Sequence, residues 1–186
     1  QIAAERERLC RTDILIIGGG AIDAGLEAEI RQLPGEVYST YGMTETLSHI
    51  ALRRLNGPDA STLYYPFPSV RLSLSPEHTL IIDAPLVCDT ILVTNDVAEI
   101  NSDGSFSILG RKDNTINTGG IKVQAEQVED ILRPWIHVPF AITSVSDAAL
   151  GEAVVLLIEN GGYTERLEEK MKELLTKYQL PKMVFS

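Results

Sequence analysis

The order of apolar and polar blocks near the start of the chain predicts two strands separated by a helix. Residues 13–17 form an apolar run that ends in glycine, which predicts a fully buried strand. Residues 23–33 place their large apolar side chains at helical spacing, and a Pro-Gly pair then ends the helix. Residues 36–39 predict the second strand. Two strands joined by a helix are normally parallel, so the expected fold class is α/β.

The middle of the chain changes to short strands separated by turns. Residues 47–54 predict an edge strand, and a loop rich in Pro, Ser and Tyr follows it. Residues 70–74, 79–82 and 90–93 are short apolar and β-branched runs that also predict strands. Residues 101–104 are a strong hairpin signal between two further runs of this kind. Together these short strands predict a small β-barrel-like subdomain.

The pattern changes again after Gly110, where helices and strands alternate in a compact α+β series. The expected elements are a hairpin over 115–123, a helix over 126–132, strands over 140–146 and 152–159, and a helix capped by Thr164. This change makes Gly110 the best domain boundary. We therefore predict that residues 1–110 belong to a larger domain and that residues 111–186 form a small α+β domain.

Composition and charge narrow the possible partners. The chain has 186 residues, 44% of them apolar, which is enough for a packed core. Its net charge of −10 argues against a nucleic-acid partner, because nucleic-acid binders usually present a basic face. No apolar run approaches the roughly 20 residues that a membrane span needs, and no secretory leader is recognisable. We expect a cytoplasmic protein.

The two ends of the sequence indicate that more chain belongs to the protein. The first residue is Gln1 rather than Met, and residues 180–186 break off while they still resemble the start of a strand. The two cysteines, Cys10 and Cys88, lie far apart and have no Cys/His cluster near them, so neither a disulfide framework nor a zinc site is indicated. We expect this chain to be the C-terminal part of a longer protein.

Candidate chemistry gathers in the stretch from Tyr38 to Glu45, at the end of the second predicted strand. Ligands of open α/β sheets bind at this end of the strands. Tyr41 offers a flat face for a base, Thr44 a hydroxyl for a phosphate oxygen, and Glu45 an oxygen ligand for Mg²⁺. Taken alone, a glycine turn flanked by Tyr and Thr is more often simply a turn.

The glycines that follow the first strand allow a competing interpretation. Residues 16–20 resemble the beginning of a dinucleotide-binding fingerprint, G-x-G-x-x-G. Counting from Gly18 puts Asp23 at the third glycine position, and counting from Gly20 puts Ile22 at the second. Neither register completes the pattern, which argues against a dinucleotide fold.

Three stretches of the chain resemble, in order and in type, signature motifs of one superfamily. They run from Tyr38 to Glu45, from Thr94 to Asp96, and from Gly110 to Lys122. The superfamily is that of the adenylate-forming enzymes, which includes acyl-CoA synthetases, luciferases and the adenylation domains of peptide synthetases. The resemblance implies a ligase that uses ATP, Mg²⁺ and coenzyme A to convert a small carboxylic acid first to an acyl-adenylate and then to a thioester.

The same resemblance implies a role for individual residues. Tyr41 stacks on adenine, Asp96 and Arg111 hold the ribose, Glu45 binds the metal, and Asp113 is the hinge of the small mobile domain. The implied catalytic residues are Thr44, Glu45 and Lys122, and the implied nucleotide- or coenzyme-binding residues are Gly19, Gly20, Ala21, Tyr41, Gly42, Asp96, Arg111, Gly119 and Gly120. Asn95 and Ala125 depart from the family, which usually has glycine and proline there.

Within the superfamily, the compact segment before Asp96 is most similar to o-succinylbenzoate–CoA ligases of menaquinone biosynthesis. An aromatic dicarboxylate needs a polar recognition group, and Ser48, His49 and Arg53 are candidates between which the sequence does not decide. The chain lacks the family's Ser/Thr/Gly-rich phosphate loop and its late Gly-Lys, so we expect it to be inactive by itself. Two alternatives stay open: another acyl- or aryl-CoA synthetase, and a nucleotide-binding module without chemistry.

Overall fold

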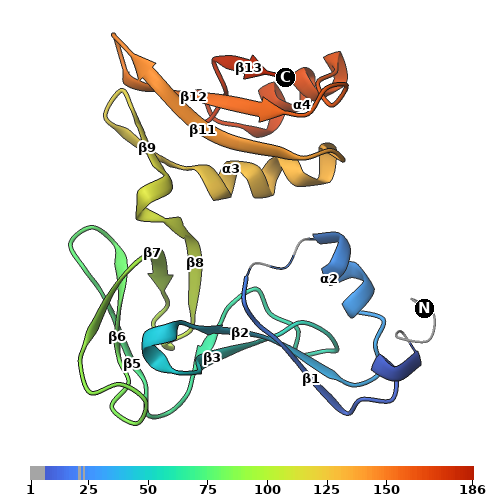
Figure 1. Ribbon diagram of the computed structural model, residues 1–186, viewed down its shortest axis with the longest axis vertical. Coiled ribbons are helices and arrows are strands. Elements are labelled where there is room, and N and C mark those ends of the chain that lie inside the picture. Colours follow the sequence, from blue (N-terminus) through green and yellow to red (C-terminus); the bar gives the residue numbers. More distant parts are fainter. Residues whose placement is uncertain (1–6, 21, 23) are drawn as a thin grey trace. The chain divides into compact units, whose positions relative to one another are not determined.

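The computed structural model describes residues 7–20, 22 and 24–186 (Figure 1). The chain divides into two compact units. The first runs up to Thr94 and resumes at Ala98–Ile108, and the second holds Asn95–Val97 and Leu109–Ser186. Each unit has its own apolar core, so each is described by itself.

The first unit begins with the strand–helix–strand arrangement that the sequence predicts. Its elements are β1 (Ile14–Ile17), α2 (Ala24–Ile30), β2 (Glu36–Gly42), the short 3-10 helix η1 (Thr44–Thr46), β3 (His49–Arg54) and β4 (Tyr65–Pro66). The strands form one sheet in the order β1-β2-β3-β4. β1 and β2 are parallel, which confirms the predicted α/β unit, and β3 returns antiparallel to β2.

The first strand is buried on only one face, so the prediction of a fully buried strand was wrong. Leu15 and Ile17 pack against the small core formed by Ile30, Val37 and Leu55. Ile14 and Ile16 point to the opposite face and are 58% and 50% exposed. The physical reason is that successive side chains of a strand point to opposite faces of the sheet, and within the described residues the small core covers only the face that carries Leu15 and Ile17.

The short strands of the middle region form a second sheet in the first unit. Its strands are β5 (Arg71–Leu74), β6 (Thr79–Asp83), β7 (Leu92–Ile100) and β8 (Phe106–Arg111), in the order β5-β6-β7-β8. The sheet is open, and no closed barrel forms in the described part of the chain. Thr94, Asn95 and Asp96 continue the strand direction, so the two runs predicted around them merge into the single strand β7.

The second unit is an antiparallel sheet with two longer helices (Figure 1). Its elements are the 3-10 turn η2 (Lys112–Asn114), β9 (Thr115–Thr118), β10 (Ile121–Gln124), α3 (Ala125–Leu132), the 3-10 turn η3 (Arg133–Trp135), β11 (Phe140–Asp147), β12 (Gly151–Ile158), α4 (Glu165–Leu174) and β13 (Met183–Phe185). The sheet order is β10-β9-β12-β11, and β13 adds parallel to β12. These elements confirm the predicted α+β series.

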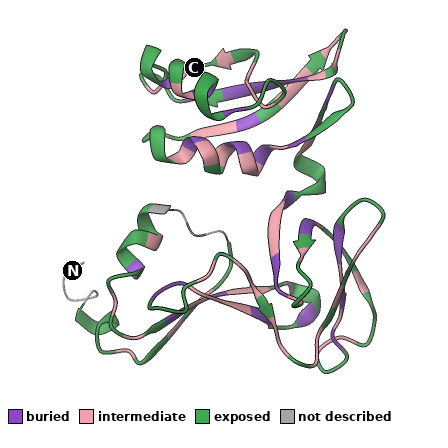
Figure 2. Ribbon diagram, turned by 180° about the vertical axis from the view of Figure 1, so that it is seen from behind, coloured by how far each residue is buried: buried purple, intermediate pink, exposed green. Residues whose placement is uncertain are grey.

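Buried residues of the second unit concentrate in the central strand β12 and on one side of each helix (Figure 2). Thr164 caps α4 as predicted, because its Oγ1 accepts a hydrogen bond from the backbone N–H of Leu167 at 3.2 Å. Leu167 and Met171 are buried, whereas Leu174 on the same helix is 39% exposed. Among the described residues, every helix is too short or too polar to cross a bilayer.

Candidate functional site

The turn that follows β2 is held in shape by the side chain of Thr46, which is fully buried. Its hydroxyl accepts a hydrogen bond from the backbone N–H of Met43 at 3.1 Å. The same oxygen lies 2.9 Å from the carbonyl oxygen of Met43 and 2.7 Å from that of Ser48, and its proton is shared between them. Thr46 therefore closes both ends of the turn that presents Thr44 and Glu45. Sequence reasoning missed it, because the third position of a capping box usually holds Glu or Gln rather than Thr.

Close backbone packing explains why position 42 is a glycine. A Cβ atom at Gly42 would lie only 2.5 Å from the carbonyl oxygen of Ser48 and 2.7 Å from the Cα of His49. Directly after the turn, Leu47 adopts a left-handed conformation with φ of 57° and is 84% exposed. A left-handed leucine is strained, because its Cβ approaches the neighbouring carbonyl. The exposed, strained leucine lies at the rim of the pocket described next.

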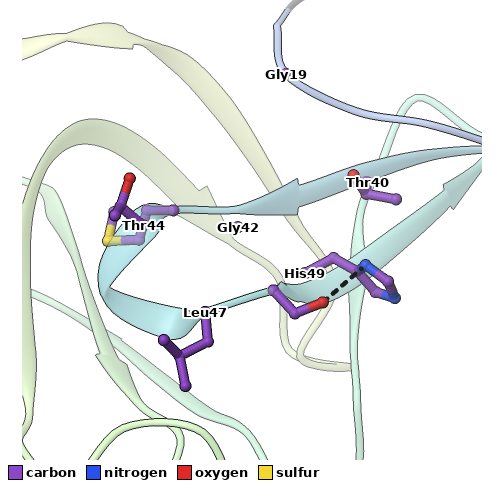
Figure 3. Close-up of a pocket in the computed structure, with 8 residues that line it drawn as sticks. Gly19, Thr40, Gly42, Thr44, Leu47 and His49 are labelled. Carbon is purple, nitrogen blue, oxygen red and sulfur yellow. Dashed lines mark hydrogen bonds between the residues drawn. The ribbon is translucent and has the colours of Figure 1, made fainter.

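A pocket of about 370 Å³ opens beside this turn (Figure 3). It is lined by Gly19, Thr40, Gly42, Met43, Thr44, Leu47, Ser48 and His49. Three hydroxyls and one imidazole supply its polar groups, and no carboxylate lines it. Ser48 Oγ and His49 Nδ1 lie 3.3 Å apart, which joins two of these polar groups in one hydrogen bond. The pocket can therefore donate several hydrogen bonds to an anionic or carbonyl-bearing ligand.

Several predicted ligand-binding residues lie next to this pocket without lining it. Tyr41 is half-buried, with its ring centroid 5.4 Å from that of Phe106 in an edge-on contact and 5.9 Å from that of Tyr64. Glu45 is exposed on η1. Gly20 is exposed in the loop after β1, and Ala21 lies outside the described residues. Of the catalytic and nucleotide-binding residues predicted in the first unit, Gly19, Gly42 and Thr44 line the pocket. The acid-recognition candidates Ser48 and His49 line it as well, and Arg53 does not.

The second unit brings Asp96, Arg111 and Asp113 together. The guanidinium of Arg111 lies 3.7 Å from Asp96 Oδ1 and 3.3 Å from Asp113 Oδ2. Asn95, which replaces the usual family glycine, reaches the same Asp113 oxygen through its Nδ2 at 3.4 Å. Arg111 thus lies between two carboxylates that are far apart in sequence. This pairing places the two residues predicted to hold the ribose side by side.

Glu126, at the start of α3, holds the segment that contains Arg111 and Asp113. Its Oε1 accepts hydrogen bonds from the backbone N–H of Arg111 at 3.2 Å and from Asn114 Nδ2 at 2.5 Å. Its Oε2 is buried without a partner in the described chain, and so is Gln124 Oε1. The Nε2 of the Gln124 amide donates to Thr115 Oγ1 at 2.8 Å.

The hairpin predicted around two glycines is present between β9 and β10. Gly119 and Gly120 have φ of 61° and 81°, the left-handed pair that a two-residue hairpin turn requires. Lys122 lies opposite Asn117 in the hairpin and is exposed. Glu152 anchors the hairpin, because its Oε2 accepts the backbone N–H of Asn117 at 2.6 Å. This hydrogen bond, with a second from Ser144, lowers the pKa of Glu152 below its ordinary value.

The candidate residues therefore form one group in each unit. The first unit carries the pocket and the turn with Thr44 and Glu45, and the second carries the Asp96–Arg111 pair and the glycine hairpin. Within the described residues, no three His, Cys, Asp or Glu side chains gather as a ready-made metal site.

The class of protein follows from these features together with comparison to known proteins. No family model matches the chain. Its homologues include several 2-succinylbenzoate–CoA ligases, and its structural neighbours include adenylate-forming enzymes. The superfamily resemblance inferred from the three motifs is confirmed.

Three of the similar proteins illustrate how far the similarity extends. The 2-succinylbenzoate–CoA ligase of Lactococcus lactis is 25% identical over 92% of this chain and 42% of that ligase. A crystal structure of an acyl-CoA synthetase (AMP-forming)/AMP-acid ligase II-like protein from Dyadobacter fermentans is 33% identical, covers 98% of this chain and 54% of that one, and has a TM-score of 0.61.

The third protein is the o-succinylbenzoate coenzyme A synthetase of Bacillus subtilis, solved in complex with ATP and magnesium ion. It is 20% identical, covers 97% of this chain and 45% of that one, and has a TM-score of 0.73, a likeness of fold. The chain spans about two fifths of the length of the curated relatives it matches.

Proposed function

We propose that this chain is part of an ATP-dependent acid–CoA ligase, and specifically of an o-succinylbenzoate–CoA ligase of menaquinone biosynthesis. The homology to 2-succinylbenzoate–CoA ligases, which extends over 92% of the chain, carries this proposal. The alternative, another aryl-CoA ligase, has support from the 4-chlorobenzoate–CoA ligase of Arthrobacter, which is 26% identical over 82% of the chain. An o-succinylbenzoate–CoA ligase and another aryl-CoA ligase would use the same two-step reaction.

In that chemistry a carboxylate oxygen of the acid attacks the α-phosphorus of ATP. The bond between the α- and β-phosphates breaks, and pyrophosphate leaves with the electron pair. A thiol, commonly that of coenzyme A, then attacks the acyl carbon and displaces AMP. Activation is needed because a free carboxylate is a poor electrophile, whereas AMP is a good leaving group. The contribution expected of the protein is to hold the reactants in line and to offset their charge.

The turn after β2 is proposed to bind the phosphate end of the nucleotide. Thr44 lines the pocket, so its hydroxyl is available as a donor to a phosphate oxygen. Glu45 is exposed on the same turn and is the residue that would hold Mg²⁺. One carboxylate is enough for this role, because Mg²⁺ in such sites takes most of its oxygens from phosphates and water. When bound, the ion offsets the negative charge of the phosphates.

The second unit is proposed to hold the ribose and to supply the mobile domain. Asp96 has acceptor oxygens for both ribose hydroxyls, and the neighbouring Arg111 places a donor, Nη1, 3.7 Å from Asp96 Oδ1. Asp113 is assigned the hinge, with residues 111–186 as the mobile domain and residues 1–110 as part of the large one. Gly119 and Gly120, which lack side chains, would leave room for the narrow pantetheine arm, and Lys122 would meet a phosphate.

The adenine is assigned to Tyr41. Its ring is half-buried, and the contacts with Phe106 and Tyr64 fix the orientation of the face that a base could stack on. Gly19, Gly20, Ala21 and Gly42 are assigned to the walls of the nucleotide and acid sites. Because ATP and coenzyme A are the proposed substrates, the cytoplasm is the proposed location.

Acid-dependent exchange of pyrophosphate into ATP tests this function. The full-length protein that carries this chain is incubated with ATP, labelled pyrophosphate and each of 2-succinylbenzoate, 4-chlorobenzoate, benzoate and a fatty acid. Exchange that is fastest with 2-succinylbenzoate is expected. Preference for a fatty acid would discard the menaquinone assignment but keep the class, and no exchange with any acid would leave a nucleotide-binding module without chemistry.

A further inference from the structure

A second pocket, of about 260 Å³, lies in the second unit, between residues 134–137 and the start of α4. Its lining residues are Pro134, Trp135, His137, Thr164, Arg166 and Leu167. None of them has a role in the proposed reaction. The volume lies just below the roughly 300–1,000 Å³ that is typical of sites for drug-sized ligands, so the pocket suits a small ligand rather than a whole nucleotide.

This pocket is remote from the glycine hairpin to which the coenzyme arm is assigned. β12 begins at Gly151, which pairs with Thr118 in that hairpin. Beyond the other end of β12, the N–H of Glu159 donates to the carbonyl of Pro139, in the segment that leads from the pocket into β11. At about 3.3 Å per residue, the eight residues of β12 span roughly 25 Å. The pocket and the hairpin therefore lie at opposite ends of the sheet.

The polar groups that line the pocket favour a negatively charged ligand. They are the indole of Trp135, the hydroxyl of Thr164, the imidazole of His137 and the guanidinium of Arg166, and no carboxylate is among them. Each of these groups can donate a hydrogen bond. Within the described residues, the side chain of Arg166 makes no ion pair and no hydrogen bond, and its recorded contact is with the Trp135 ring. The pocket thus contains a cation whose charge the fold leaves uncompensated.

The position of Arg166 in α4 is unfavourable for a cation. It lies in the first turn of the helix, at the positive end of the helix dipole. Lys170, one turn further along, also approaches Trp135, and the two cationic groups lie 6.0 Å and 4.7 Å from the centroid of the indole ring. Lys170 is compensated by Glu173 at 2.5 Å, whereas Arg166 has no carboxylate partner in the described chain. Local rules of this kind are broken mainly at functional sites.

The contact between Arg166 and Trp135 prepares the guanidinium for binding. A guanidinium that packs on an aromatic ring is partly ordered before a ligand arrives, so less entropy is lost on binding. Its planar group of N–H donors can hold a carboxylate or a phosphate through two parallel hydrogen bonds. Pro134 and Leu167 add apolar surface to the same pocket, and Trp135 is 36% exposed.

We propose that this pocket binds a small organic anion, a carboxylate or phosphate group carried on a short apolar body. Arg166 binds the charged group, and the apolar body packs against Pro134 and Leu167. The site is additional to the proposed ligase reaction and does not depend on it. A ligand held there occupies the second unit at the end away from the glycine hairpin.

Tryptophan fluorescence tests this proposal, because Trp135 is the only tryptophan of the chain and lines the pocket. The chain is titrated with benzoate, with phenyl phosphate and with benzamide, which has the shape of benzoate without its charge. We expect a saturable change of fluorescence with at least one of the two anions and none with benzamide. The anion that binds more tightly identifies the charged group as carboxylate or phosphate.

Arg166→Gln removes the charge and keeps most of the side chain. We expect it to weaken binding of the anion by about 10- to 100-fold, as for loss of hydrogen bonds to a charged group. Its thermal unfolding midpoint should be unchanged or higher, because a cation is removed from the positive end of the helix dipole. Lys172→Gln is the matched control, since Lys172 lies on the same helix, pairs with Glu168 and does not line the pocket. Lys172→Gln should bind like the wild type.

Three outcomes would overturn the inference. They are the absence of a saturable change with both anions, binding of benzamide as tight as that of benzoate, and binding by Arg166→Gln as tight as that by the wild type. A lower unfolding midpoint in Arg166→Gln together with unchanged binding would make the arginine purely structural. The titration contains no ATP, so failure of pyrophosphate exchange would sink the ligase function and leave this site standing.

Discussion

The carboxylate of Glu126 accepts a hydrogen bond from the backbone N–H of Arg111 at 3.2 Å, which ties the start of α3 to the segment that carries the predicted hinge. The same oxygen also binds Asn114 Nδ2, so the residues from 111 to 114 are held at both ends by one side chain. Gly110 lies against the other carboxylate oxygen, and its φ of 149° is a conformation that favours glycine. One side chain of α3, that of Glu126, therefore holds residues 111–114 in place through hydrogen bonds at both ends of the segment.

Replacing Glu126 with alanine should loosen the segment from Arg111 to Asn114. The backbone N–H of Arg111 loses its acceptor and becomes free to exchange with solvent, so we expect its hydrogen exchange to accelerate by about tenfold or more, equivalent to about 1.4 kcal/mol of local opening. Amide exchange followed by NMR measures this directly. Gln127→Ala, on the neighbouring position of the same helix, is the control and should leave the rate unchanged. An unaltered Arg111 rate in Glu126→Ala would show that the hydrogen bond does not restrain the segment.

Thr46→Val tests whether the buried hydroxyl shapes the turn that presents Thr44 and Glu45. Valine keeps the size of the side chain but leaves the N–H of Met43 and the carbonyl of Ser48 without their partner. We expect the free energy of unfolding to fall by about 1–3 kcal/mol, measured with denaturant. The matched control is Thr44→Val, two residues earlier and exposed, which should change it by less than about 0.5 kcal/mol. Equal effects of the two substitutions would contradict the assignment.

Much of the fold could be predicted from the sequence because local patterns determine it. The strand–helix–strand unit at the start, the hairpin at Gly119 and Gly120, and the cap at Thr164 each depend on a few neighbouring residues. The predictions went wrong where burial depends on distant parts of the chain. Ile14 is as apolar as Ile17, but the two side chains point to opposite faces of β1, and only the face of Ile17 is covered by the small core.

The candidate site was predictable in its residue types but not in its contacts. The resemblance pointed to Asp96 and Arg111, and the structure places them 3.7 Å apart. Thr46 and Glu126 were missed because each binds backbone groups, which leave no trace in the pattern of side chains. The start of β3 was placed too early, at Leu47, because nothing in the sequence indicates that a leucine adopts a left-handed conformation.

The stability of the second unit should depend on the ionisation of Glu152. Its pKa is lowered in the folded state by hydrogen bonds from the N–H of Asn117 and the hydroxyl of Ser144. A lowered folded-state pKa means that this stabilisation is fully present above the ordinary glutamate pKa of about 4.3 and is lost as the pH falls through the folded-state value. The midpoint of thermal unfolding should therefore drop in this range of acid pH.

Glu152→Gln should make that dependence on pH shallower, because glutamine does not titrate. Its unfolding midpoint is compared with that of the wild type from about pH 6 to about pH 3. Glu159→Gln is the control, since the Glu159 carboxylate is exposed and makes no hydrogen bond within the described chain. If the wild type and Glu152→Gln lose stability in parallel, Glu152 does not contribute to the acid sensitivity.

We expect this chain to bind nucleotide through Asp96 without being able to form an adenylate. The chain carries the proposed ribose pair but lacks the family's lysine-ended phosphate loop and its late Gly-Lys, so we expect weak binding of AMP and no acyl-AMP. Asp96→Ala removes the acceptor for the ribose hydroxyls and should weaken binding by about tenfold or more, as expected for hydrogen bonds to a charged group.

Titration of AMP followed by calorimetry measures this effect, with Asp89→Ala as the control because Asp89 is exposed in the loop before β7. Thermal unfolding of each variant checks that the second unit stays folded without the Asp96–Arg111 contact. If Asp96→Ala binds AMP as tightly as the wild type, the ribose is not held by the Asp96–Arg111 pair. If the purified chain synthesises acyl-AMP, the two missing lysines are dispensable. If the wild type binds AMP and Asp96→Ala does not, the ribose half of the nucleotide site lies in this chain, at the contact between Asp96 and Arg111.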